Sequence, residues 1–224
     1  IDQGTTSTRV ILFDTKGNTK FISQFEFKQY FPNNGWVEHN PNEIWMTTLK
    51  SLKKVMQKVK QLKGKILSIG ITNQRETTVL WNKKNGRPIY NAIVWQDRRT
   101  QKYCQNLKKS NYENNIRKKT GLFIDPYFSA TKIKWILDNV KKSKKLLKTN
   151  NLLFGTIDSF LIWKLTKGKK HLTEATNASR TMLFNINTNK WDKNILKKLK
   201  IPSKILPEVK NSADDFGITD KKLT

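Results

Sequence analysis

Short apolar stretches of strand length alternate along this chain with longer segments of helical character. Stretches typical of strands occupy positions 9–14, 19–27, 66–71, 77–81, 89–95 and 152–156. Segments with helical spacing or helix-start signals occupy positions 41–59, 99–108, 130–140 and 159–166. Strands and helices in this order predict a mixed α/β domain built from packed layers.

The clearest helix start follows a loop rich in glycine, proline and asparagine at positions 31–40. Asn40 is expected to cap this helix, with Pro41 in its first turn and Glu43 three residues after the cap. The residues at helical spacing are expected to form the buried face: Trp45, Leu49, Leu52, Met56 and Val59. Asp158 is expected to cap the helix at 159–166, and the tail from Ile201 is expected to lack a closing element.

The formal net charge of +27 raises the question of nucleic-acid binding, because clustered lysine and arginine neutralise phosphates. The lysines, however, are scattered along nearly every segment. Arginine, the better residue for gripping phosphates and reading bases, is sparse. This distribution is typical of lysine on solvated surfaces, so no nucleic-acid partner is expected.

The chain has no run near the ~18 consecutive apolar residues that a membrane span requires, so no membrane insertion is expected. The single cysteine, Cys104, excludes an intramolecular disulfide and fits a reducing, cytoplasmic location. His39 and His171 lie far apart in the sequence, so no zinc site built from cysteine and histidine is expected.

The first segment whose residues suit ligand binding or catalysis is DQGTTSTR at positions 2–9, directly before an apolar stretch. A glycine lets backbone N–H groups approach anionic oxygens, and the following hydroxyls can donate hydrogen bonds to a phosphate. Asp2 can hold a magnesium ion or its water shell. An ordinary hairpin turn would explain the same residues, and the segment does not have the spacing of a Walker loop.

A second segment, GITNQRETT at positions 70–78, is a buried stretch that emerges into polar residues. Arg75 can donate hydrogen bonds to the vicinal hydroxyls of a small polyol, and Glu76 can accept them. Sites of this kind discriminate strongly against analogues that lack the hydroxyl. A solvated turn with an ordinary ion pair is the alternative interpretation.

Two further segments carry aromatic residues. In IVWQDRR at positions 93–99, Trp95 can form an apolar wall against a polyol, or can be an ordinary core residue. In TGLFIDPYFS at positions 120–129, Tyr127 can present its hydroxyl to a ligand, or can simply pack in its loop.

Together and in this order, these four segments resemble the glycerol kinases of the FGGY family of sugar kinases. The resemblance continues through GWVEH at 35–39, YNAIVWQ at 90–96 and TNASRTMLF at 176–184, and extends to about position 217. It implies an actin-like, ribonuclease-H-like ATPase domain with a mixed sheet flanked by helices, the first of two FGGY domains. It also implies ATP- and magnesium-dependent phosphorylation of glycerol to sn-glycerol 3-phosphate in glycerol catabolism.

The resemblance also implies roles for individual residues. The residues expected to bind glycerol are Arg75, Glu76 and Tyr127, with Trp95 as a wall of the pocket. Those expected to face the nucleotide phosphates are Thr5, Thr6, Ser7 and Arg9, with Asp2 near magnesium. One departure from the family pattern is Glu174-Ala175, which puts the local packing before Thr176 in question.

The catalytic aspartate of the family lies in a Gly-Asp-Gln segment that is not found in positions 1–224. We therefore expect one FGGY N-terminal domain over positions 1–224, truncated at both ends, with the C-terminal nucleotide-binding domain absent. Such a chain is expected to be inactive alone, because it lacks a general base and the closing domain. The alternatives are an FGGY kinase that acts on a pentose, or a truncated, non-catalytic binding protein. A homo-oligomer is possible at full length.

Overall fold

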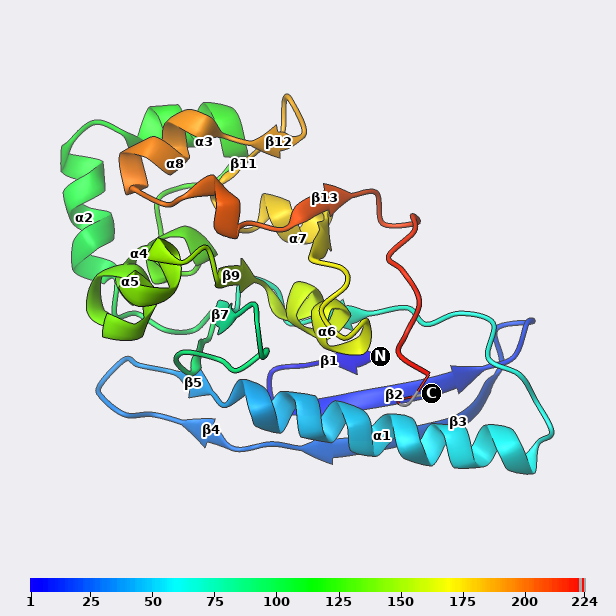
Figure 1. Ribbon diagram of the computed structural model, residues 1–224. Helices are drawn as coiled ribbons and strands as arrows, with labels where there is room; N and C mark the ends of the chain where they lie inside the picture. The colour runs from blue at the N-terminus through cyan, green and yellow to red at the C-terminus, as the bar shows by residue number, and fades with distance from the viewer. Residues whose placement is uncertain (222, 224) are drawn as a thin grey trace.

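A computed structural model describes residues 1–221 and 223 and shows a mixed sheet beneath a group of helices (Figure 1). The sheet has the strand order β3-β2-β1-β6, from Thr19–Glu26, Ser7–Phe13, Asp2–Gln3 and Thr72–Asn73. β1 is antiparallel to β2 and parallel to β6. The long helix α1, Pro41–Gln61, lies along this sheet (Figure 1). The predicted α/β class is therefore confirmed.

The remaining strands form small sheets. β4 (Gln29–Tyr30), β5 (Glu38–His39) and β8 (Ala92–Ile93) make one sheet. Three further pairs are β7 (Val79–Asn82) with β9 (Leu152–Gly155), β10 (Leu172–Glu174) with β13 (Glu208–Lys210), and β11 (Phe184–Asn185) with β12 (Lys190–Trp191).

Most other helices lie in the upper part of Figure 1. They are α2 (Gln101–Lys109), α3 (Glu113–Thr120), α4 (Ser129–Asn139), α5 (Lys141–Lys148), α6 (Ile157–Leu165), α7 (Ala175–Ser179), α8 (Lys193–Leu199) and the 3-10 turn η1 (Ser203–Ile205). Over the described ranges 1–221 and 223, no helix combines the length and the apolar composition needed to cross a bilayer.

The start of α1 follows the sequence prediction, but its buried face is rotated. The Asn40 side chain accepts a hydrogen bond from the N–H of Asn42 at 2.9 Å, as a helix cap does. The residues fully buried along the helix are Pro41, Ile44, Thr48, Ser51, Leu52, Val55 and Val59, whereas Trp45, Leu49 and Met56 are half-buried. The centre of the buried face contains the small polar residues Thr48 and Ser51, which an apolar pattern does not detect. The predicted buried face was therefore centred too far to one side of the helix.

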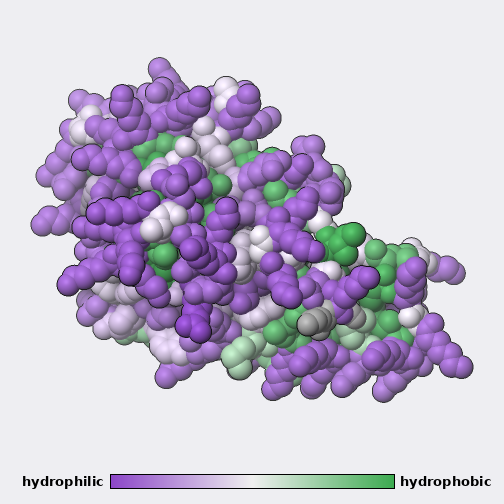
Figure 2. Space-filling view, in the orientation of Figure 1, coloured by the Kyte–Doolittle hydropathy of each residue, from purple (hydrophilic) through white to green (hydrophobic). Residues whose placement is uncertain are grey.

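The prediction of a buried strand over 66–71 is wrong. In the described part of the chain, the peptide groups of 66–69 make no hydrogen bond, and Leu67 is 77% exposed. β1 reaches only Thr72 and Asn73 on this side. A groove of about 820 Å³ separates β2 from the extended segment 64–70. Figure 2 shows hydrophobic surface on the side of the molecule where this segment and the C-terminal tail lie.

Two further predictions about element ends are corrected. The helix near 159–166 is α6, and its N-cap is Thr156, so Asp158 lies inside the first turn. Asp158 is buried and accepts hydrogen bonds from the hydroxyls of Thr156 at 2.5 Å and Thr173 at 2.6 Å. Burial raises the pKa of Asp158 to about 6. The tail also contains a closing element, because β13 pairs with β10.

The departure at Glu174 is accommodated locally. Its carboxylate caps α7 by accepting hydrogen bonds from the N–H groups of Thr176 at 2.8 Å and Asn177 at 2.6 Å. It also accepts a hydrogen bond from the hydroxyl of Ser212 at 2.9 Å. The glutamate at this position therefore caps the helix and connects it to the tail.

Gly86 has no room for a side chain, which gives the first prediction. Its φ is +66°, and an added Cβ would lie 2.3 Å from the ring of Trp163. Gly17 has φ +82° with open space around it. Gly86→Ala is expected to lower the free energy of unfolding by about 2–4 kcal/mol, and Gly17→Ala by about 1 kcal/mol, because only the first adds overpacking to left-handed strain. Urea unfolding measures both, and equal losses would contradict the prediction.

Candidate functional site

The segment at positions 2–9 forms a hairpin between β1 and β2. The N–H of Gly4 donates to the carbonyl of Ser7 at 2.9 Å and closes the turn. The N–H groups of Thr5 and Thr6 make no hydrogen bond with other residues in the described ranges, and Thr6 is exposed. Free, adjacent N–H groups beside exposed hydroxyls are suited to an anionic oxygen. The hairpin and the phosphate interpretations of this segment are therefore compatible.

Asp2 and Arg9 face each other across this hairpin. The Asp2 carboxylate lies 3.9 Å from Arg9 Nη1, and both side chains are 43% exposed. Among residues 1–221 and 223, no group of three or more side chains is arranged to hold a metal by itself. Magnesium is commonly bound through one or two carboxylates together with substrate phosphates. Asp2 beside the hairpin fits that mode of binding.

Glu76 lies at the end of the second segment in a strained backbone conformation. Its φ is +63°, its residue is 2% exposed, and its carbonyl accepts from the hydroxyls of Thr78 at 3.1 Å and Ser129 at 2.8 Å. A bulky residue with positive φ is unusual and often marks a functional site. One carboxylate oxygen of Glu76 accepts from Arg180 Nε at 2.7 Å. The other has no hydrogen-bond partner among the described residues.

Trp95 and Tyr127 form an aromatic wall beside Glu76. Their ring centroids lie 5.5 Å apart, and both residues are half-buried. The guanidinium of Arg180 lies 5.7 Å from the centroid of Tyr127, so it links this wall to Glu76. The indole N–H of Trp95 donates to the Thr5 hydroxyl at 3.1 Å. That hydrogen bond brings the aromatic wall against the hairpin at 2–9.

Arg75 lies differently from the other predicted residues. It is exposed, and its guanidinium makes no hydrogen bond or ion pair with any residue that the structure describes. The charge that pairs with Glu76 comes instead from Arg180, a residue that is not among the predicted site residues. The spacing of 104 residues between them gives no periodic signal that would have joined the pair.

A buried polar network joins the two halves of the site. Gln74 donates to the side chain of Gln3 and to the carbonyl of Gly4, both at 3.1 Å. It also lies 3.3 Å from His39 Nδ1 and accepts from the Thr77 hydroxyl at 2.9 Å. Burial lowers the pKa of His39 to about 4, so this ring stays neutral near pH 7. The network fixes the hairpin relative to the segment that ends in Glu76.

Lys132, in the first turn of α4, is fully buried beneath this site. Its Nζ donates to the carbonyls of Pro126 at 2.7 Å and Tyr127 at 2.5 Å. Burial lowers the pKa of Lys132 to about 7, opposed by nearby Asp97, Glu76, Cys104 and Asp125. A buried lysine is rare and costly unless its charge has partners.

The lowered pKa of Lys132 makes stability depend on pH. Between about pH 7 and 10 the unfolded chain binds one more proton at this lysine than the folded chain does. The free energy of unfolding is therefore expected to rise with pH across this window, by up to about 1.4 kcal/mol per pH unit. Lys132→Met removes this contribution. Urea unfolding of both proteins at pH 7, 8 and 9 measures it, and parallel pH profiles would contradict the prediction.

Solved structures of carbohydrate kinases share this fold. The crystal structure of Plasmodium falciparum glycerol kinase with ADP matches 99% of this chain and 44% of that chain, with a TM-score of 0.94 and 36% identity. Gluconate kinase from Lactobacillus acidophilus shares the fold, with a TM-score of 0.88 over 99% of this chain and 43% of that chain, at 24% identity. The expected actin-like kinase domain is confirmed, and the class of the chain is that of a kinase domain.

The sequence then gives the family. Residues 1–224 match the N-terminal domain of the FGGY family of carbohydrate kinases, and the chain belongs to this family. It is 57% identical over 220 residues to glycerol kinase of Petrotoga mobilis, covering 98% of this chain and 44% of the relative. It is 57% identical over 219 residues to glycerol kinase of Lactobacillus acidophilus, with the same coverage. The chain therefore spans less than half the length of these relatives.

Proposed function

We propose that this chain forms the glycerol-binding and first phosphate-binding part of a glycerol kinase. That enzyme would transfer the γ-phosphate of ATP to glycerol, giving sn-glycerol 3-phosphate and ADP. The observation that carries the proposal is the hydrogen bond from Trp95 to Thr5, because it holds the aromatic wall, which Arg180 links to Glu76, against the hairpin that is proposed to bind phosphate. The identity of 57% to glycerol kinases supports glycerol as the substrate.

In this proposal each predicted residue has a role that its position allows. The free oxygen of Glu76 accepts from a glycerol hydroxyl, Tyr127 presents its hydroxyl, and Trp95 packs against the carbon chain. Arg75, exposed and without a protein partner in the described ranges, is free to donate to a second hydroxyl.

The hairpin supplies the phosphate contacts in this proposal. Thr5, Thr6, Ser7 and Arg9 face the nucleotide phosphates, and Asp2 holds magnesium or its water shell. Bound magnesium would neutralise charge on the transferring phosphoryl group. The contribution of the chain itself is to fix the acceptor hydroxyl near the phosphate, which is the larger part of such catalysis.

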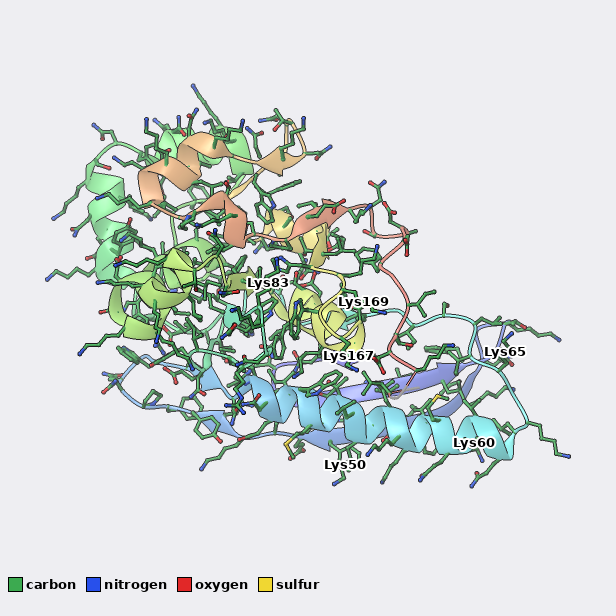
Figure 3. The ribbon with its side chains drawn as sticks, in the orientation of Figure 1. Lys50, Lys60, Lys65, Lys83, Lys167 and Lys169 are labelled. Atoms are coloured by element: carbon green, nitrogen blue, oxygen red, sulfur yellow. The ribbon has the colours of Figure 1, made fainter. Side chains whose placement is uncertain are left out.

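We also propose that the 224 residues do not phosphorylate glycerol by themselves, because they do not contain the expected general base. The proposal further includes a cytoplasmic location, no nucleic-acid partner, and an oligomer at full length. The lysines labelled in Figure 3 come from several elements: α1 (Lys50, Lys60), the segment after it (Lys65), the turn after β7 (Lys83) and the turn after α6 (Lys167, Lys169). Lysines scattered along the sequence, together with few arginines, support solvation more than one nucleic-acid surface.

Calorimetric titration of the chain with glycerol, xylulose and ribulose tests the substrate. Binding of glycerol in preference to both pentoses is the expected result. Preference for a pentose would replace glycerol by a sugar substrate, and binding of none would leave no support for a polyol site in this chain. Incubation with ATP, magnesium and glycerol tests turnover, and formation of sn-glycerol 3-phosphate would refute the proposed inactivity.

A further inference from the structure

The first turn of α4 makes a separate hydrogen bond to each of four segments around the site. These contacts are Ser129 Oγ to the Glu76 carbonyl at 2.8 Å, Ala130 N–H to the Thr181 carbonyl at 2.9 Å, Thr131 Oγ1 to Thr100 Oγ1 at 2.8 Å, and Lys132 Nζ to the Tyr127 carbonyl at 2.5 Å. Consecutive residues of a helix point in different directions, so a single turn can reach all four segments.

These four segments are the ones that carry the candidate pocket. One contains Glu76, a second contains Arg180 next to Thr181, a third leads from Trp95 to Thr100, and the fourth contains Tyr127. All four residues of the turn are at most 1% exposed, so water does not compete for these hydrogen bonds. Buried, fully satisfied polar groups of this kind hold a single arrangement of the segments that they join.

Burial of the Lys132 side chain has the clearest energetic cost in this turn. It is 0% exposed, and the partners of its Nζ are the carbonyls of Pro126 and Tyr127, with that of Phe128 at 3.4 Å. An apolar side chain would avoid burying a lysine, so packing alone does not account for it. Its hydrogen bonds hold the two peptide groups that flank the Tyr127 Cα, and therefore the direction in which the Tyr127 side chain leaves the backbone.

We propose that the first turn of α4 is the positioning element of the polyol pocket, in which Ser129 sets Glu76 and Lys132 sets Tyr127 against Trp95. This inference rests on the proposed function for the nature of the ligand, but its geometry can be tested without ligand. Neither residue touches the substrate; each acts through the residue that it holds. A displacement of about 1 Å in such contacts is enough to lose most of their value.

Two single substitutions separate the two halves of the proposal. Lys132→Met removes the hydrogen bonds to the Tyr127 loop, and Ser129→Ala removes the one to the Glu76 carbonyl. Lys145→Met is the matched control, because Lys145 is an exposed lysine on α5. Nuclear magnetic resonance follows two signals in each protein: the ring-to-ring contact between Tyr127 and Trp95, and the Arg180 Nε–H that bonds Glu76.

Lys132→Met is expected to lose the ring contact and keep the Arg180 Nε–H hydrogen-bonded to Glu76, whereas Ser129→Ala is expected to weaken that hydrogen bond and keep the ring contact. Each variant is expected to bind glycerol about tenfold more weakly, and the control is expected to match the original chain. The proposal is overturned if both contacts survive in both variants, or if both variants lose both contacts together, as general loosening would produce.

The proposed function and the positioning role of α4 are tested separately by these measurements. If the original chain binds no glycerol, the proposed function fails, while the two ligand-free signals still decide the positioning role. If glycerol binds equally to all the proteins although the contacts have changed, the positioning role fails and the function stands. Ser129→Ala removes one hydroxyl only, so it gives a decision on its own half even where Lys132→Met does not fold.

Discussion

Replacing Glu76 by glutamine is expected to weaken glycerol binding roughly 100-fold. The carboxylate has one oxygen on Arg180 Nε at 2.7 Å and the other without a partner among the described residues. The amide must turn its NH₂ either toward Arg180, where two donors would meet, or toward the substrate hydroxyl that needs an acceptor. Hydrogen bonds to a charged group contribute about 1.5–3 kcal/mol, which corresponds to a loss of this size.

Calorimetric titration with glycerol measures this loss. Glu208→Gln is the matched control, because the Glu208 side chain is 66% exposed on β13 and, among the residues that the structure describes, pairs only with Lys210. The control is expected to bind glycerol like the original chain. Equal affinity for Glu76→Gln and the original chain would mean that this carboxylate does not contact glycerol.

Arg99→Met is expected to lower the free energy of unfolding by about 3–5 kcal/mol, the largest effect on stability among these variants. The Arg99 side chain is fully buried and pairs with Glu38 at 2.7 Å and Asp97 at 2.8 Å. Its guanidinium also lies 3.8 Å from the ring of Trp36 and 4.7 Å from that of Trp135. Methionine can fill the space between the rings but leaves two buried carboxylates without their cation.

The neighbouring residue provides the control for Arg99. Arg98 also pairs with a carboxylate, Asp125 at 3.1 Å, but the two side chains are 49% and 38% exposed. Arg98→Met is therefore expected to cost less than about 1 kcal/mol, since exposed ion pairs are worth little. Urea unfolding of both variants at pH 7 gives the comparison. Similar losses at the two positions would show that burial does not decide the energetic value of these ion pairs.

The sequence predicted elements best where a local signal was sufficient. The cap at Asn40, the strands β2 and β3, and the strand β9 all lie close to their expected positions. A strand was wrongly predicted over 66–71. A strand needs a neighbouring strand to pair with, and apolar composition does not show whether one is present. The predicted cap of α6 was wrong because Asp158 lies inside the first turn, where its carboxylate accepts hydrogen bonds from the hydroxyls of Thr156 and Thr173.

The candidate site was predictable only in part for the same reason. Strand-end polar residues such as Glu76 stand out in a sequence, and the structure brings Glu76, Trp95 and Tyr127 into one neighbourhood. Arg180 does not stand out because it lies far from those residues in the chain, and Lys132 does not because lysine is abundant everywhere in the sequence. The positive φ of Glu76 depends on hydrogen bonds from elsewhere in the fold, which no local pattern contains.

The open groove beside β2 has a consequence for the behaviour of the chain in solution. An unpaired sheet side flanked by exposed apolar residues is a template for edge-to-edge association. The net charge of +27 opposes this, because copies of the chain repel one another before their edges can meet. High salt shortens the range of that repulsion to a few ångströms. The solubility of this protein is therefore expected to fall as ionic strength rises, and lysine is the residue type that keeps its copies apart.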